Sequence, residues 1–262
     1  MSPERELPGP PGTRFYSVEH VTETGSTNAD LLERAKKGAL EGIVLVTDHQ
    51  TAGRGRQARG WHDEPGNAML MSVLLRPAAS FATLVPLLAG LAATDAVDQV
   101  LDGDRGRAGL KWPNDVVVPE LGERKLAGIL AEAITVPGSE PRLVVVVGMG
   151  LNLRWSAPPP PEIAARAAVL EELAGHDIDR WEVVNQVLRG FETWLQRATE
   201  QGPFALLDEY RKRCVTLGRA VRFQTPTDVI EGTAVAIADS GGLVIDRQGE
   251  RITVTAGDAH HV

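Results

Sequence analysis

The stretch "GRGRQARGW" at residues 53–61 brings together the side chains best suited to hold an anion. Arg54, Arg56 and Arg59 recur at every second or third position among three glycines, and Trp61 ends the stretch. Planar guanidinium groups can present paired donors to carboxylate or phosphate oxygens, and glycine lets the backbone approach a ligand closely. The whole chain has a formal net charge of −8, so the basic stretch is a local feature. It predicts an anion-binding loop, with a solvated loop or a weak attraction to RNA as alternatives.

A second polar group lies in "KWPND" at residues 111–115, where Lys111, Asn114 and Asp115 flank Pro113. Asn and Asp beside a proline are common turn formers, which is one interpretation of the motif. The other interpretation is a binding site, because a lysine next to an amide and a carboxylate can hold a phosphate and its metal ion.

Two further polar residues lie in apolar stretches. Lys125 begins "KLAGIL" and, taken alone, is an ordinary edge lysine. Asn152 closes "GMGLN", which has the G-x-G of a dinucleotide-binding loop but lacks its third glycine, so a Rossmann site is weakly supported. The sequence contains no P-loop, kinase glycine-rich loop or Cys/His metal cluster.

The helices and strands that must position these residues are predicted from hydrophobic periodicity and from the glycines and prolines that interrupt it. A strand, a loop and a helix are expected over 15–38, with Thr27 as the helix cap and Gly38 as its stop. Further strands are expected over 42–50, 67–77, 109–118, 124–135 and 142–153. Further helices are expected over 80–101, 178–202 and 203–213. The proline-rich residues 154–177 predict a long surface loop.

The pattern changes at about Cys214, after which short alternating runs broken by turns predict a small antiparallel β module. The predicted organisation is a mobile tail over 1–13, an α+β domain over 14–213 and a β domain over 214–262. A single cysteine excludes an intrachain disulfide and fits a packed residue in a cytoplasmic protein. No apolar run is long enough to span a membrane, no secretory signal begins the sequence, and the negative charge argues against broad nucleic-acid binding.

Five motifs, in this order, resemble the biotin protein ligase family. They are "GSTN" (25–28), "HQTAGRGRQARGW" (49–61), "KWPND" (111–115), "KLAGIL" (125–130) and "GMGLNL" (148–153), followed by the small β module. The resemblance runs from about residue 14 to the end, and it implies a class II synthetase-like mixed sheet with helices plus an SH3-like β-barrel. The loop departs from the family pattern G-R-G-R-x-G-R-x-W, because Ala58 replaces a glycine and Gly60 is displaced. No helix-turn-helix precedes the motifs, so a repressor function is not expected.

The resemblance implies a two-step reaction. Biotin and ATP give biotinyl-5′-AMP and pyrophosphate, and biotin then passes to a lysine of the carboxyl carrier domain of an acyl-CoA or pyruvate carboxylase. ATP and Mg²⁺ are the expected co-substrate and activator, with no tightly bound prosthetic group. The expected protein is a monomer or weak homodimer in the cytoplasm, with neither nucleic acid nor membrane as partner.

The resemblance also assigns roles to residues. Biotin is expected to contact Ser26, Thr27, Asn28, Gln50, Arg54, Gly55, Arg56 and Lys125. ATP or the adenylate is expected to contact Arg54, Arg56, Arg59, Trp61, Lys111, Asn114 and Asn152. The expected catalytic residues are Lys125, Lys111, Arg54 and Asp115. Asp115 is also the expected Mg²⁺ ligand and a candidate acceptor for the carrier lysine's proton, and Trp155 joins Trp61 in closing over the ligands. Residues 53–61 and 155–168 are expected to order over the adenylate.

Three alternatives remain from the sequence. A lipoate ligase or lipoyl transferase uses a related fold and a similar adenylate, but "GRGRxxR" and "KWPND" favour biotin. A nucleic-acid-binding regulator would use the Arg/Gly loop. A simple biotin-binding module would need neither Lys111 nor Asp115.

Overall fold

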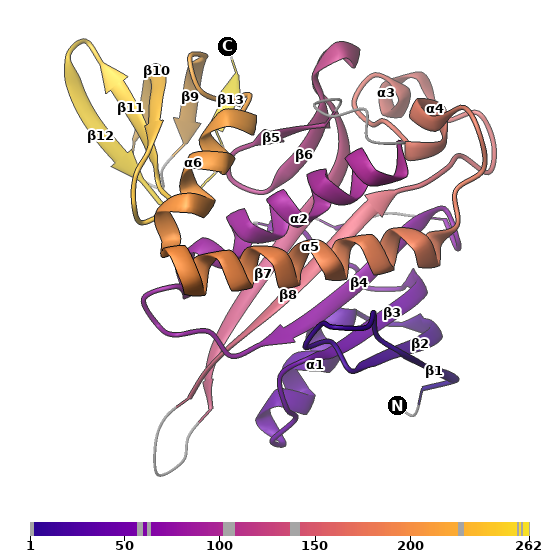
Figure 1. Cartoon of the computed structure of the whole chain (residues 1–262). Helices are drawn as coiled ribbons and strands as arrows, with labels where there is room; N and C mark the ends of the chain where they lie inside the picture. Colours follow the sequence, from indigo (N-terminus) through magenta and orange to yellow (C-terminus); the bar gives the residue numbers. More distant parts are fainter. Residues whose placement is uncertain are drawn as a thin grey trace.

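The structure is a computed structural model that describes residues 3–56, 60–61, 64–101, 108–136, 142–224, 228–255, 257 and 259–261. It contains an eight-stranded mixed sheet flanked by helices and a second, five-stranded sheet formed by the C-terminal part of the chain (Figure 1). The α+β fold class predicted from the sequence is confirmed.

The first sheet has the strand order β1-β2-β3-β4-β8-β7-β6-β5. Its strands are β1 (Arg5–Pro8), β2 (Ser17–Thr24), β3 (Ile43–Gln50), β4 (Ala68–Leu75), β5 (Gly109–Lys111), β6 (Asp115–Val118), β7 (Arg124–Val136) and β8 (Arg142–Asn152). Only the β2–β3 pair is parallel among the described strands; the other neighbours are antiparallel. The long β7 and β8 therefore lie between the two halves of the sheet that carry the sequence motifs.

Helices cover both faces of this sheet. They are α1 (Thr27–Lys36), α2 (Val85–Val100), α3 (Pro161–Ala164), α4 (Leu170–Ala174), α5 (Arg180–Gln201) and α6 (Pro203–Arg213), with short 3-10 turns η2 (Ala82–Leu84) and η3 (Pro119–Leu121). On one face α2 and α5 run side by side (Figure 1) and bury side chains such as Val145 and Val147 of β8. On the other face α1 covers Val144 and Val146. Consecutive residues of β8 thus enter opposite cores, which explains its continuous apolar sequence.

The second sheet is antiparallel and has the strand order β12-β11-β10-β9-β13. Its strands are β9 (Ala220–Gln224), β10 (Val229–Ile237), β11 (Leu243–Arg247), β12 (Glu250–Val254) and β13 (Ala259–His261). In the described residues β12 and β13 lie at opposite edges, so the sheet is open and the expected closed barrel is not formed. Its inward side chains, among them Val221 and Phe223, join the same apolar cluster as α2 and α5.

Four local expectations are corrected by the structure. Residues 5–8 of the expected mobile tail form β1, which pairs with β2. The residue that caps α1 is Ser26, whose hydroxyl accepts from Ala29 N, while Thr27 begins the helix. The single strand expected over 109–118 is the hairpin of β5 and β6. The surface loop expected over 154–177 contains α3 and α4, and Leu170 of α4 is fully buried in the core.

The boundary between residues 213 and 214 stays a prediction. Among the helices that the structure describes, none has the length and apolarity to cross a bilayer.

Candidate active site

A cavity of about 490 Å³ opens between the two halves of the large sheet and the last strand of the second sheet. The basic loop, the "KWPND" turn and the glycines of β7 and β8 meet around it. Most of the residues that the sequence analysis singled out line this cavity: Ser26, Thr27, Asn28, Gln50, Arg54, Gly55, Arg56, Trp61, Lys111, Asn114, Asp115 and Lys125.

Two expected residues are placed differently, and the structure does not test a third. Arg59 lies outside the described residues. Asn152 does not line the cavity; its Nδ2 donates to Lys125 O at 3.2 Å and to Ala168 O at 3.1 Å, so it supports the backbone that carries Lys125. Trp155 is also absent from the lining, and its Nε1 donates to Glu172 Oε1 at 3.0 Å.

One side of the cavity is a hydrogen-bonded network of uncharged side chains at the start of α1, with the carboxylate of Glu132 at its edge. Gln50 Oε1 accepts from Thr27 N at 2.9 Å and from Thr27 Oγ1 at 3.1 Å. Asn28 Nδ2 donates to Leu130 O at 3.1 Å and to Glu132 Oε2 at 2.9 Å. Ser72 Oγ lies 2.7 Å from both Thr27 Oγ1 and Asn28 Oδ1. Because Thr27, Asn28 and Ser72 are buried and all of these groups are paired, their donors and acceptors are held in fixed directions.

The sequence analysis missed Ser72 and Glu132 in this network. A signal was present for Ser72, because it is the one polar residue in the strand sequence "AMLMSVLL" and is fully buried. A buried hydroxyl in such a strand needs a hydrogen-bond partner.

The floor of the cavity is formed by glycines beneath the indole of Trp61. Gly128 and Gly150 are cross-strand neighbours in β7 and β8. A Cβ on Gly150 would lie 2.5 Å from Trp61 Cζ2, and one on Gly128 would lie 3.0 Å from Trp61 Cζ3. Lys125 Nζ lies 5.6 Å from the centroid of the same ring. Within the described part of the chain Trp61 Nε1 is buried without a hydrogen-bond partner. The two glycines therefore create the space that a flat ring occupies.

The other side of the cavity is charged. Lys125 Nζ lies 2.8 Å from Asp115 Oδ1, and Lys111 Nζ lies 3.3 Å from Glu123 Oε2. Lys125 and Asp115 are 37% and 28% exposed, which keeps their ion pair in contact with water and able to exchange partners, whereas Glu123 is less exposed.

The basic loop is attached to both sides of the cavity. Arg54 Nη2 lies 3.2 Å from Glu132 Oε2, the carboxylate at the edge of the network beside α1. Arg56 donates to Asn114 Oδ1 at 3.2 Å and to Gly257 O at 3.0 Å, on the charged side. Arg54 and Arg56 therefore lie where an anion that contacts both sides of the cavity would bind.

Arg166 is a further cation on the cavity wall that the sequence analysis missed. Its carbonyl accepts from Lys125 N at 2.7 Å, and Ala168 N donates to Lys125 O at 2.9 Å. These bonds fix residues 166–168 beside β7. The proline-rich composition of this segment predicts a surface loop, so the sequence did not indicate its contact with the sheet.

The second sheet completes the cavity and supports the "KWPND" turn. Ala259 and His260 of its last strand line the cavity. Trp112 N donates to Thr216 Oγ1 and Trp112 Nε1 donates to Gly241 O, both at 3.0 Å. The tryptophan thereby fixes the turn from which Asn114 and Asp115 project.

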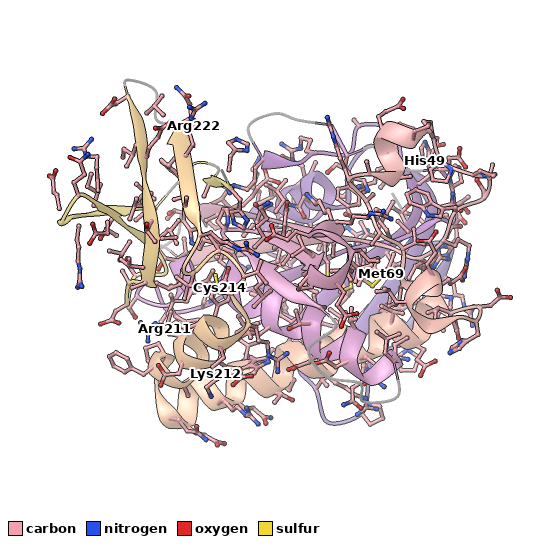
Figure 2. All side chains as sticks on the ribbon, turned by 90° about the horizontal axis from the view of Figure 1, so that it is seen from above. His49, Met69, Arg211, Lys212, Cys214 and Arg222 are labelled. Carbon is pink, nitrogen blue, oxygen red and sulfur yellow. The ribbon has the colours of Figure 1, made fainter. Side chains whose placement is uncertain are left out.

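Cys214 takes no part in the cavity. It is 7% exposed, and burial raises the pKa of its thiol. Figure 2 shows it well inside the outline of the molecule, next to α6. A buried, protonated thiol is a poor nucleophile, so the prediction of a packed cysteine is confirmed.

The described residues contain no group of three or more His, Cys, Asp or Glu side chains that could hold a metal ion. Two carboxylates line the cavity in the described part of the chain, Asp115 beside Lys125 and Glu123 beside Lys111. This donor set fits a Mg²⁺ ion that enters with a nucleotide as its complex better than a resident ion.

Comparison with known proteins agrees with this arrangement. The sequence profile of the biotin/lipoate A/B protein ligase family matches residues 20–152, and the profile of the biotin protein ligase C-terminal domain matches residues 216–262. The chain belongs to the biotin/lipoate A/B protein ligase family.

Within this family, the chain is 38% identical to the biotin–[acetyl-CoA-carboxylase] ligase of Mycobacterium tuberculosis, over 96% of this chain and 91% of that protein. It is 31% identical to the same-named ligase of Paracoccus denitrificans, over 91% of this chain and 98% of that one. The solved biotin protein ligase of Aquifex aeolicus in complex with biotin and ATP superposes with a TM-score of 0.75 at 30% identity, covering 93% and 97% of the two chains. The family and enzyme class predicted from five motifs are confirmed.

Proposed function

We propose that this chain activates biotin with ATP, releasing pyrophosphate, and transfers biotin from biotinyl-5′-AMP to a lysine of a carboxylase carrier domain. The observation that carries the proposal is the cavity itself, which places an uncharged polar network and a set of cations on opposite sides of one space. Relatives named biotin–[acetyl-CoA-carboxylase] ligase support the same activity and a carrier domain of that carboxylase class as acceptor.

The uncharged network is the proposed site of the biotin ring. A ureido group is neutral and has two N–H donors and one carbonyl acceptor, which fixed hydroxyl and amide groups can match. Thr27, Asn28 and Gln50 are held by part-buried hydrogen bonds, and Ser26 caps the same helix. Fixed groups lose little freedom on binding, which favours affinity and selectivity.

The first step brings the biotin carboxylate against the α-phosphate of ATP. Two unit negative charges about 4 Å apart repel by about 4 kcal/mol at an effective dielectric constant of about 20. Arg54, Arg56 and Lys125 line the cavity. In the proposed reaction the two arginines neutralise the carboxylate and phosphate, and Lys125 stabilises charge on the reacting oxygens. Cations that are in position before the reaction lower the barrier without reorganisation.

The remaining polar groups of the charged side act on the nucleotide. Lys111 and Asn114 would contact its phosphates, and Asp115 would hold the Mg²⁺ that enters with them and offsets their charge. Carboxylate oxygen beside phosphate oxygens is a donor set that Mg²⁺ accepts. Trp61 packs over the glycines of β7 and β8, where its ring shields the ligand from water.

In the second step the carrier lysine, as its neutral amine, attacks the acyl carbon. An amide C–N bond forms, the acyl–phosphate C–O bond breaks, and AMP leaves with the electron pair of that bond. The nitrogen gives up a proton as the amide forms. Asp115, 2.8 Å from Lys125, is the carboxylate placed to orient the amine and accept this proton.

Mass spectrometry tests the proposal directly. The protein is incubated with biotin, MgATP and a biotin carrier domain, and the expected product is one biotinyl adduct on a single carrier lysine. Parallel incubations replace biotin by lipoate or omit ATP, and neither is expected to modify the carrier. Lipoylation in place of biotinylation, or biotinylation without ATP, would reject the proposal.

The finer predictions about this chain rest on the sequence. The monomeric or weakly dimeric state, the cytoplasmic location and the lack of nucleic-acid binding stay predictions. A gel-shift assay at several salt concentrations checks the last of them, because attraction of an Arg/Gly loop to phosphates is strongly salt-dependent.

A further inference from the structure

Glu123 occupies a position that neither the motifs nor the expected reaction assigns. It lies between η3 and β7, lines the cavity, and has a positive φ of 61°. Gly122 before it also has a positive φ, of 69°. Glycine or asparagine adopts this left-handed conformation far more readily than glutamate does. Glu123 and Gln248 are the two described non-glycine residues with a positive φ, and of these Glu123 alone lines the cavity.

The carboxylate of Glu123 has three basic neighbours from three parts of the chain. Its Oε2 lies 3.3 Å from Lys111 Nζ and 2.7 Å from His261 Nδ1. Its Oε1 lies 3.3 Å from Arg219 Nη2. Lys111 belongs to the "KWPND" region, whereas His261 is in β13 and Arg219 immediately precedes β9. The side chain of Glu123 is only 17% exposed, so the carboxylate is enclosed by these partners.

The partners on the second sheet are themselves held in place. His261 Nε2 lies 3.3 Å from Thr216 Oγ1, which also accepts the hydrogen bond from Trp112 N. Glu123 N donates to Val118 O at 3.1 Å, which fixes its own turn. The second sheet and the turn therefore fix the Glu123 carboxylate, and the carboxylate fixes the Lys111 ammonium at the cavity wall.

We propose that Glu123 is a positioning residue through which the second sheet holds Lys111 in the direction needed for the nucleotide phosphates. The proposal deepens the function proposed above and rests on it for the role of Lys111. The lysine side chain is flexible and its ammonium has three equivalent donors. A neighbour that holds the ammonium in one position therefore increases its contribution to the stability of a transition state.

The central test is a cycle of Glu123→Gln and Lys111→Gln variants, with single-turnover adenylate formation as the readout. Glu123→Gln alone is expected to slow adenylate formation about ten-fold, the effect of losing one charge-assisted contact in the transition state. Added to Lys111→Gln, it is expected to cause less than about a two-fold further change, because residues that act through each other are not additive. Two effects that multiply would overturn the proposal.

A second kinetic readout separates positioning from a general structural defect. The KM for biotin is expected to stay within about two-fold of wild type in Glu123→Gln while the rate constant falls. Glu120→Gln is the matched control, because Glu120 lies in the same turn, is exposed and loses the same charge. Equal slowing by both variants would show that the charge of the turn, rather than the Glu123 contact, is responsible.

Two further measurements keep the proposal testable if Glu123→Gln folds poorly or if the wild-type chain forms no adenylate. His261→Gln and Arg219→Gln each remove one partner of the Glu123 carboxylate on the side of the second sheet. Each is expected to slow adenylate formation by about two- to three-fold in a chain with Lys111, and to have no further effect in Lys111→Gln. Labelling of lysine amines by an amine-reactive ester, read by mass spectrometry, needs no activity. Lys111 is expected to label faster in Glu123→Gln than in wild type or Glu120→Gln, and an unchanged rate would refute the contact.

Discussion

The two sides of the cavity are held together by different kinds of interaction. On the side of α1, Thr27, Gln50, Asn28 and Ser72 form neutral hydrogen bonds that are largely buried. On the side of the second sheet, pairs such as Lys125 with Asp115 are partly exposed ion pairs. Buried neutral networks are rigid and costly to interrupt, whereas exposed ion pairs contribute little stability and can exchange partners. We infer that one side contributes mainly shape and selectivity, and the other mainly charge for the reaction.

The largest expected effect is on the charged side. Lys125→Ala is expected to lower biotin-dependent pyrophosphate release about 100-fold or more, which is on the order of 3 kcal/mol of lost transition-state stabilisation. The melting temperature is expected to change little, because the Lys125–Asp115 pair is partly exposed. Lys37→Ala, which removes an exposed lysine at the end of α1, is the control. A near-normal rate of pyrophosphate release would contradict the role of Lys125.

The neutral side is expected to respond in the opposite way. Ser72→Ala removes a hydroxyl that lies 2.7 Å from two buried oxygens, and is expected to lower the free energy of unfolding by about 1–3 kcal/mol. Denaturant unfolding measures this loss, and the KM for biotin is expected to rise as well. Ser80→Ala, at an exposed position, should change neither quantity. If Ser72→Ala were as stable as wild type, the distinction between the two sides would fail.

Gly150→Ala tests the floor that the two sides share. The added methyl group would lie 2.5 Å from Trp61 Cζ2, so the indole must move. The expected result is a rise of about ten-fold in the KM for biotin, equivalent to about 1.4 kcal/mol, with a smaller effect on the rate constant. Gly25→Ala is the matched change, because no atom lies within 4 Å of its added methyl group. Equal effects of the two variants would show that Trp61 is not the group displaced.

The smallest expected effect concerns the contact between the charged side and the second sheet. Burial, with a contribution from the Lys111 ammonium, lowers the pKa of the His261 imidazole below its ordinary 6.5. The unfolded chain then binds this proton more readily than the folded chain, so the associated stability is present above pH 6.5 and is lost as the pH falls.

His261→Gln removes this dependence. Between pH 7.5 and pH 5.5 its melting temperature is expected to fall less than that of wild type, by a difference of less than about 2 °C. His176→Gln, at an exposed histidine, is expected to behave as wild type. A steeper fall in His261→Gln would mean that His261 is charged in the folded protein.

The sequence predicted the cations of the site better than their partners. Arginines and lysines in short motifs with glycine or proline are conspicuous, and nearly all of the described ones line the cavity. Glu132 is 78 residues from Arg54, and Gly257 is 201 residues from Arg56. Only the folded sheet brings such positions together, so no local pattern could indicate them.

Helices and strands with strong periodicity were likewise predictable, as α5 and β8 show. The errors lie where local composition and tertiary packing disagree. The proline-rich segment after β8 resembles a loop, yet Ala168 and Leu170 are fully buried and Lys125 pairs with its backbone. The open second sheet differs from the expected barrel for a related reason, because its inner face packs on the large domain and needs no closure.

That shared packing restricts how the enzyme can move. Phe223 and Ile245 of the second sheet belong to one apolar cluster with Leu88 of α2 and Phe191 of α5. Two bodies that share a continuous core cannot rotate about a hinge without exposing it. Closure over a reactive intermediate must therefore come from loops at the rim, and domain rotation is expected to be absent from its catalytic cycle.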